Sequence, residues 1–274
     1  MRTKRPRMAA GRARALGLPT RGTTNPNRLR RVDRWLLGTP SVLGVLDLAE
    51  PDDGPLVVDL GFGASPVTTV ELHARLRAVR PDVRVVGLEL DPDRVASALT
   101  AAVPPSLEFR RGGFELAGHR PLLVRAFNVL RQYQEVDAAR AWLTITGGLA
   151  PGGLLIEGTC DEIGRRCCWV TLTETGPRTL TLACRPHDLE RPSDLAERLP
   201  KSLIHHNVPG QRVHSVLSEL DACWAAAAPF VPFGPRVRWA EAVKLLVGRG
   251  VPVLDRPRRW RAGEITLPWD VVAA

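Results

Sequence analysis

The chain has 274 residues, a formal net charge of +9 and 44% apolar residues. This composition is ordinary for a globular protein, and the length suits one large domain or a domain with an appendage. No apolar run is long enough to span a bilayer, and the first residues lack the apolar stretch of a secretory signal. The five cysteines include no Cys-x-x-Cys pair. We therefore expect a cytoplasmic protein with reduced thiols, no membrane contact and no metal site.

The positive charge is concentrated at the start of the chain. Residues 1–34 hold eleven basic side chains and one acid, Asp33, so this segment carries +10 and residues 35–274 carry −1. Such a segment could contact the phosphates of a nucleic acid, or it could be a solvated tail. We expect a basic, flexible arm over residues 1–34.

After the arm, two short helices are expected over 27–37 and 41–50, and strands and helices then alternate. Short apolar runs predict strands at 56–60, 83–90, 107–112, 121–130 and 152–159. Helical patterns lie between them, at 66–79, 92–103 and 136–149. Repeated strand–helix units of this kind predict a parallel sheet with helices on both faces.

The pattern changes after the fifth strand. Two β-rich runs, 167–174 and 178–185, flank a Gly-Pro turn and predict a hairpin, which forces an antiparallel pairing. From residue 186 onward the pattern is mainly helical. The expected organisation is thus an arm (1–34), a ligand-binding core (35–185) and a helical C-terminal extension (186–274) packed on the core.

A glycine turn follows the first predicted strand, in "VVDLGFGASP". Gly61 and Gly63 suit a turn that brings backbone N–H groups close to a ligand, and Ser65 with Pro66 signals a helix start. Nicotinamide and flavin proteins have a third glycine at the position of Pro66. Asp59, at the strand end, would repel a pyrophosphate but attract an ammonium group. S-adenosylmethionine carries an ammonium group and no phosphate, so the sequence favours it over a nicotinamide cofactor.

The second predicted strand ends on an acid, Glu89, in "VVGLELDP". An acid at the tip of the neighbouring strand is placed to accept hydrogen bonds from ribose hydroxyls. Asp91 is an alternative, although the run from Asp91 to Asp93 is also typical of a helix cap.

These two segments resemble motif I and the acidic second-strand motif of class I S-adenosylmethionine-dependent methyltransferases, over roughly residues 42–185. The resemblance implies an α/β, Rossmann-like, mostly parallel seven-stranded sheet with a terminal antiparallel strand. It also implies S-adenosyl-L-methionine as cofactor, with S-adenosyl-L-homocysteine as product. Asp59 would contact the methionine ammonium, directly or through water, and Glu89 the ribose. The expected cofactor-binding residues are Asp59, Gly61, Phe62, Gly63, Ser65, Glu89, Gly113, Phe114 and Asn128.

The adenine and acceptor ends are less well marked. "RRGGFEL" places Gly113 and Phe114 where the family supplies an adenine contact, but the family's usual acid is missing, and Glu115 is the polar alternative. The fourth strand ends in "FNVLRQY", without the Asn/Asp-Pro-Pro-aromatic pattern of methylases that act on base amino groups. The substrate candidates at this edge are Arg131, Tyr133 and Arg165.

The resemblance implies methyl transfer by in-line displacement, to a small molecule or an RNA. This reaction depends mainly on positioning, so we assign no catalytic residue. The basic arm favours RNA, whereas the near-neutral remainder and the C-terminal helices favour a small molecule. The alternative is a non-catalytic protein that binds the cofactor, or RNA, through a methyltransferase-like fold. The acceptor atom and the oligomeric state are left open.

Overall fold

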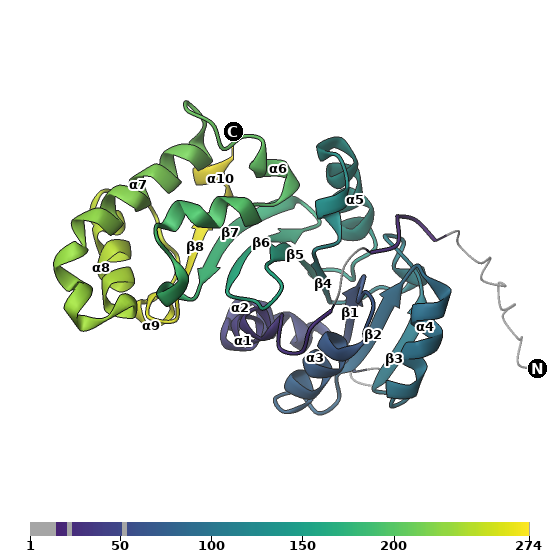
Figure 1. Ribbon diagram of the computed structural model, residues 1–274. Coiled ribbons are helices and arrows are strands. Elements are labelled where there is room, and N and C mark those ends of the chain that lie inside the picture. Colours follow the sequence, from purple (N-terminus) through teal and green to yellow (C-terminus); the bar gives the residue numbers. More distant parts are fainter. Residues whose placement is uncertain (1–14, 21–23, 51–53, 274) are drawn as a thin grey trace, which may run out of the picture.

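The computed structural model describes residues 15–20, 24–50 and 54–273, and one eight-stranded sheet runs through it (Figure 1). The strands lie side by side in the order β3-β2-β1-β4-β5-β6-β7-β8. Strands β1 to β5 are parallel, and the β5–β6, β6–β7 and β7–β8 pairs are antiparallel. The strands are β1 Leu56–Leu60, β2 Arg84–Glu89, β3 Leu107–Arg111, β4 Leu123–Phe127, β5 Leu154–Cys160, β6 Arg166–Thr173, β7 Gly176–Cys184 and β8 Glu264–Pro268.

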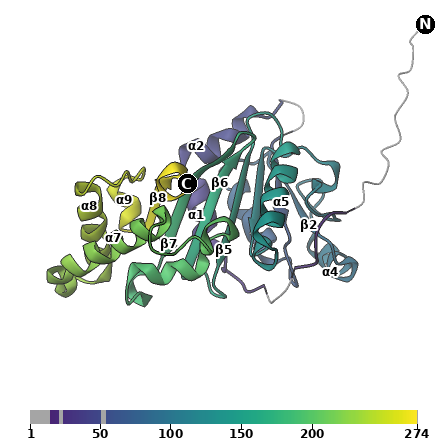
Figure 2. The same ribbon diagram turned by 90° about the horizontal axis from the view of Figure 1, so that it is seen from above.

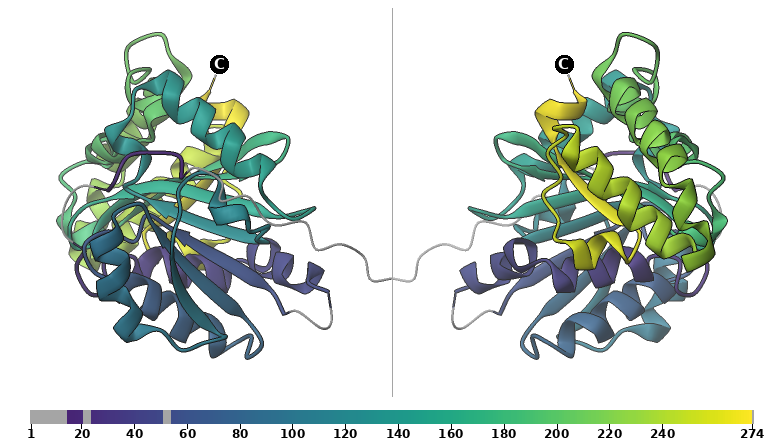
Figure 3. Two further views of the ribbon diagram at one scale, coloured as in Figure 1. Left: turned by 90° about the vertical axis from the view of Figure 1, so that its right-hand side faces the viewer. Right: turned by 90° about the vertical axis from the view of Figure 1, so that its left-hand side faces the viewer.

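Helices cover both faces of the sheet (Figure 3). One face packs against α1 to α4 around Trp35 and Leu72, and the other packs against α5, α7 and α8 around Ile145, Leu220 and Trp239. Helices α7 and α8 lie beside β7 and β8, far from α4 (Figure 2). The helices are α1 Arg30–Gly38, α2 Pro40–Leu43, α3 Val67–Arg77, α4 Pro92–Ala98, α5 Glu135–Gly147, α6 Lys201–Ile204, α7 Arg212–Ala226, α8 Pro235–Gly248, α9 Pro257–Trp260 and α10 Trp269–Val272. This arrangement confirms the expected α/β, Rossmann-like architecture.

Strands β1 and β4 are buried because helices cover both of their faces, and they are therefore almost wholly apolar. The exceptions are Asp59 of β1 and Arg125 of β4, which are direct neighbours in the parallel register. The chain leaves β1 for α3 on one face and leaves β4 for α5 on the other. The two connections therefore diverge at the carboxyl edge of the sheet, which is where ligands bind in open α/β folds.

The C-terminal segment differs from the expected all-helical extension. Strand β8 pairs antiparallel with β7, so the sheet has one strand more than expected. Ile265 and Leu267 are fully buried in this strand, and the buried Glu264 is paired with Arg259 at 3.0 Å. The hairpin expected after the fifth strand is confirmed as β6–β7. None of the described helices has both the length and the apolar character needed to cross a bilayer.

The segment expected to be a flexible arm is partly built into the fold. Helix α1 begins at Arg30, and residues 15–20, which we call the N-terminal segment, lie against the carboxyl edge of the sheet. Val32 and Trp35 of α1 are buried in the core. Residues 1–14 lie outside the described part of the chain.

Candidate functional site

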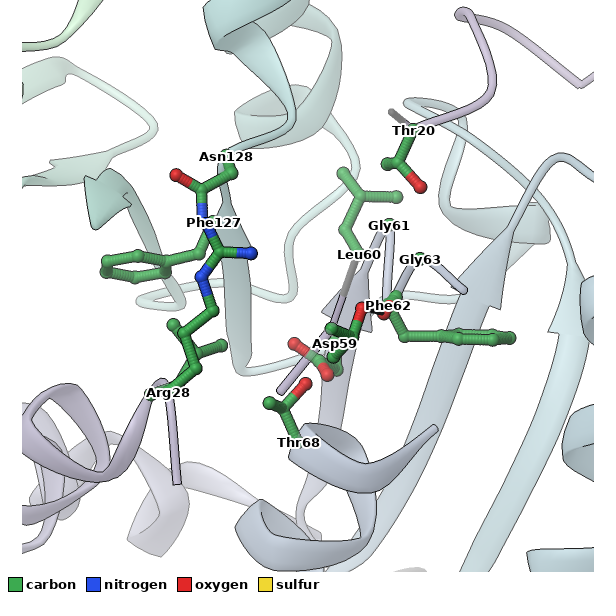
Figure 4. Close-up of a pocket in the computed structure, with 12 residues that line it drawn as sticks. Thr20, Arg28, Asp59, Leu60, Gly61, Phe62, Gly63, Thr68, Phe127 and Asn128 are labelled. Atoms are coloured by element: carbon green, nitrogen blue, oxygen red, sulfur yellow. Dashed lines mark hydrogen bonds between the residues drawn. The ribbon is translucent and has the colours of Figure 1, made fainter. Parts of the chain in front are cut away.

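The predicted glycine turn lies directly after β1, at the point where the two connections diverge (Figure 4). Gly61 and Gly63 have φ angles of 72° and 81°, a left-handed conformation that favours glycine. The Gly61 N–H donates to the carbonyl of Leu88 at 2.7 Å, and the Gly63 N–H donates to the carboxylate of Glu89 at 3.0 Å. The turn is therefore tied to β2, and Glu89 is held at its side.

The other two predicted residues of the turn support it rather than project into it. Phe62 is buried edge-on against Phe109, with ring centroids 5.3 Å apart. Its ring points away from the turn in Figure 4. The Ser65 hydroxyl accepts a long 3.4 Å hydrogen bond from the Val67 N–H, and α3 begins at Val67, one residue later than the sequence suggested. Both residues fix the shape of the turn and the start of α3.

Asp59 is part of a buried ion network. Arg125 donates to both of its carboxylate oxygens at 2.8 Å, and the Thr69 hydroxyl donates at 2.6 Å. The same guanidinium contacts Asp33 of α1 at 2.5 Å, and Arg75 of α3 contacts the other oxygen of Asp33 at 2.5 Å. Arg75 also pairs with Glu71 at 3.3 Å, so two guanidiniums are shared among three carboxylates.

Burial and pairing act against each other in this network. Burial raises the pKa of Asp33, while Arg125 and Arg75 oppose the rise. Burial alone would lower the pKa of Arg125, but Asp59 and Asp33 raise it above its already high ordinary value. Asp59 is only 3% exposed, and its carboxylate is already engaged by Arg125 and Thr69.

Glu89 is held by donors from both sides. The Thr20 hydroxyl donates to its Oε2 at 2.6 Å, the Gly63 N–H donates to the same oxygen, and the Leu90 N–H donates to Oε1 at 2.8 Å. Arg94 lies 3.9 Å from Oε2 and also donates to the Thr20 carbonyl at 2.7 Å. The carboxylate at the tip of β2 therefore already accepts a hydroxyl group, as a ribose-binding acid must.

The predicted adenine end is also in contact with the N-terminal segment. The Phe114 N–H donates to the carbonyl of Leu16 at 2.9 Å. A Cβ atom on Gly113 would lie 1.9 Å from that carbonyl oxygen, so only glycine fits there. Tyr133 packs against Phe114, with ring centroids 5.4 Å apart, and its hydroxyl contacts the backbone of Leu18.

The N-terminal segment thus fills the predicted cofactor cleft. The part around Asp59, the turn and Asn128 has about 40 Å³ of free volume, and the part around Glu89 and Phe114 has about 10 Å³. Ligand pockets usually have about 300–1,000 Å³. A cofactor can enter this cleft only if the N-terminal segment moves out.

A larger polar chamber of about 550 Å³ adjoins the cleft and shares Arg28 and Asn128 with it. Both of these side chains are labelled in Figure 4. Asn128 has a φ of 60°, and its side chain bridges to β5, accepting from the Cys160 N–H at 3.0 Å. Arg28 donates to the Cys160 carbonyl at 3.3 Å. Arg131 also lines the chamber and donates to the carbonyl of Glu197 at 2.9 Å.

Two of the three substrate candidates lie elsewhere than expected. Tyr133 belongs to the adenine end of the cleft, because the turn after β4 directs its ring toward Phe114. Arg165 lines a separate hollow and pairs with Asp188 at 3.4 Å. Only Arg131 lies in the chamber.

Four residues of the site escaped the sequence analysis: Thr20, Arg28, Asp33 and Arg125. An arginine inside the apolar run "LLVRAF" was a usable signal, because a buried guanidinium needs a carboxylate partner. The other three lie in the segment that was taken for an arm. In the described part of the chain, no cluster of three or more His, Cys, Asp or Glu side chains could hold a metal ion.

No protein-family model and no curated protein matches this chain. Similar solved structures include an O-methyltransferase family 2 protein from Planctomyces limnophilus in complex with apigenin (18% identity, TM-score 0.34, covering 49% of this chain and 44% of that one). Also similar is an S-adenosylmethionine-dependent methyltransferase from Mesorhizobium loti (22% identity, TM-score 0.32, covering 49% of this chain and 64% of that one). Another is human N-acetylserotonin methyltransferase in complex with SAM (21% identity, TM-score 0.32, covering 50% of this chain and 39% of that one). The chain spans less than two thirds of each of these proteins, and alignments this weak say nothing about its activity.

Proposed function

We propose that the protein is an S-adenosylmethionine-dependent methyltransferase. One observation carries the proposal: the hydrogen-bonding groups of the cleft are already engaged by stand-ins for an adenosine. The Thr20 hydroxyl takes the place of a ribose hydroxyl on Glu89, and the Leu16 carbonyl takes the place of an adenine ring nitrogen at the Phe114 N–H. Both contacts lie at the carboxyl edge of the sheet, at the end of β2 and after β3, and the Glu89 contact is beside the glycine turn.

The residues of the cleft suit the cofactor in polarity. Glycine at position 113 leaves room that any side chain would fill, and the rings of Phe114 and Tyr133 provide an apolar wall. We propose that Arg28, which lies between the cleft and the chamber, holds the methionine carboxylate. In this proposal Asp59 is a positioning residue that keeps β1, β4 and α1 in register, because Arg125 has neutralised it.

The chamber next to Asn128 and Arg131 is where we place the methyl acceptor. When bound, the cofactor supplies an electrophilic methyl group: the acceptor forms the new bond, the sulfur keeps the electron pair of the broken one, and any proton on the acceptor leaves to water. The side chains of the chamber orient the acceptor, and such positioning accounts for much of the rate of these reactions.

A non-catalytic role is the second candidate, because the N-terminal segment fills the cleft. Titration calorimetry with S-adenosylhomocysteine tests the cofactor site itself. We expect the wild type to bind, Glu89→Gln to lose at least about tenfold in affinity, and Glu108→Gln on β3 to bind as the wild type does, since Glu108 lies outside the cleft. Equal affinity in all three proteins, or none in the wild type, would contradict the proposed site.

Methyl transfer needs its own measurement. Radiolabelled S-adenosylmethionine is incubated with cell-extract fractions and either the wild type or Glu89→Gln. We expect transfer into at least one fraction by the wild type only. Tight cofactor binding with no transfer to any fraction would favour the non-catalytic role.

A further inference from the structure

A hollow of about 820 Å³ on the same molecule is lined mainly by arginines. They come from α1, from α8 and from the segment around α9, which are far apart in the sequence. The hollow is built by direct contacts: Arg31 donates to the carbonyl of Ala262 at 2.8 Å, and Arg259 donates to that of Trp35 at 3.2 Å. Arg30, Arg31 and Arg34, from the end of the segment expected to be an arm, therefore lie beside basic residues of the C-terminal segment.

Most of these arginines have no carboxylate partner among the residues that the structure describes. Arg165 and Arg259, which also line the hollow, are paired with Asp188 and Glu264. The remaining arginines make no ion pair with any residue that the structure describes. These six are Arg30, Arg31, Arg34, Arg236, Arg258 and Arg261. Like charges held together in a concave surface repel one another and create a strong field for an anion.

The number and type of these side chains indicate the anion. A planar guanidinium can donate two parallel hydrogen bonds to two oxygens of one phosphate, and it stays charged at every relevant pH. Six unpaired guanidiniums are more than a single phosphate group needs, so the hollow fits a row of phosphates. A polynucleotide backbone carries one negative charge per phosphate along its length, and proteins bind it through such clusters.

The position of the hollow connects it to the proposed acceptor chamber. Ile163 lines both, and the chamber adds Arg28, Arg131 and Arg198. The chamber in turn shares Asn128 with the methionine end of the cleft. The chamber thus shares lining residues with both the cofactor cleft and the arginine hollow, so the three lie next to one another.

We propose that the methyl acceptor is a nucleotide within a polynucleotide strand, with the strand's phosphates in the arginine hollow and the accepting nucleotide in the chamber. The placement of the nucleotide rests on the proposed function, whereas binding of the strand does not. The net charge of residues 35–274 is only −1, yet arginines from this part of the chain gather in the hollow beside those of α1.

The test uses the full chain and fluorescence anisotropy with a short fluorescein-labelled single-stranded RNA, and with DNA of the same sequence. The triple variant Arg34→Glu, Arg258→Glu and Arg261→Glu reverses three exposed, unpaired arginines of the hollow. The matched control reverses exposed arginines that do not line it: Arg77→Glu, Arg140→Glu and Arg178→Glu. The two variants have the same net charge, so a difference in their nucleic-acid affinity shows that the position of the arginines matters, and not only their number.

We expect the hollow variant to bind the RNA or the DNA at least about 30-fold more weakly than the control variant, with a shallower dependence on salt. Its affinity for S-adenosylhomocysteine stays that of the wild type. Equal nucleic-acid affinity in the two variants overturns the inference, and so does displacement of the RNA by polyglutamate at equal charge concentration. Because strand binding is measured without cofactor, its failure is distinguishable from failure of the cofactor site.

Discussion

Replacing Asp59 by asparagine removes one carboxylate from a guanidinium that has no access to water. Arg125 is fully buried, and after the change it keeps Asp33 at 2.5 Å and the Thr68 carbonyl at 2.9 Å. Removing one partner of a buried ion pair costs about 3–5 kcal/mol. Since Asp33 remains paired with Arg125, we expect a loss near the lower end of this range, about 3 kcal/mol in the free energy of unfolding. The total free energy of unfolding of a native protein is usually about 5–15 kcal/mol, so this loss is a large part of it.

Urea unfolding of the wild type, Asp59→Asn and Asp47→Asn measures this cost. Asp47 is the matched control, because its side chain is 73% exposed and its pair with Arg80 lies at the surface. Such pairs contribute at most about 1 kcal/mol. Arg125→Met, made in the wild type and in Asp59→Asn, completes a double-mutant cycle, for which we expect a coupling energy of at least about 1 kcal/mol.

A loss below about 1 kcal/mol in Asp59→Asn, or no coupling to Arg125, would refute the buried network as a stabilising element. The same proteins are then titrated with S-adenosylhomocysteine. If Asp59→Asn keeps its stability but loses binding, Asp59 contacts the cofactor directly, as the sequence suggested. The structural account expects the opposite: lower stability, and affinity retained in the protein that remains folded.

Two further predictions concern other polar groups. Burial raises the pKa of Glu157 from 4.5 to about 8. Between these two pH values the folded state keeps a proton that the unfolded state loses. The free energy of unfolding therefore falls as the pH rises from about 4.5 to 8, by up to about 5 kcal/mol. Glu157→Gln should therefore unfold at higher urea than the wild type at pH 8, and an equal fall with pH in both proteins would contradict this. Thr20→Val removes the 2.6 Å hydrogen bond that holds the N-terminal segment on Glu89. Calorimetry should then show about tenfold tighter binding of S-adenosylhomocysteine, because the segment competes less well for the cleft. Unchanged or weaker binding would mean that the segment does not compete with the ligand.

Much of the fold could be predicted because its signals are local. Short apolar runs, helix starts and a Gly-Pro turn give the five parallel strands and the β6–β7 hairpin. Strand β8 was missed because it contains a carboxylate and pairs with β7 about eighty residues earlier in the chain. Its burial of Glu264 depends on Arg259, a contact that strand periodicity does not reveal.

Some residues of the site could likewise be predicted from local sequence, and others could not. The turn and Glu89 could be read from their order along the chain, since the ends of neighbouring parallel strands meet at one edge. The neutralisation of Asp59 could not, because Asp33 and Arg125 come from α1 and β4. Charge counting misled for a related reason: it separated the arginines of residues 1–34 from those around α9, although folding brings them to one hollow.

The central claim is that S-adenosylmethionine binds where the N-terminal segment now lies. A crystal structure of the protein with S-adenosylhomocysteine tests it most directly. We predict the ribose hydroxyls on Glu89, the adenine beside Phe114, and residues 15–20 displaced from the cleft. A structure at saturating ligand in which Thr20 still donates to Glu89 and Leu16 still accepts from Phe114 would contradict the account.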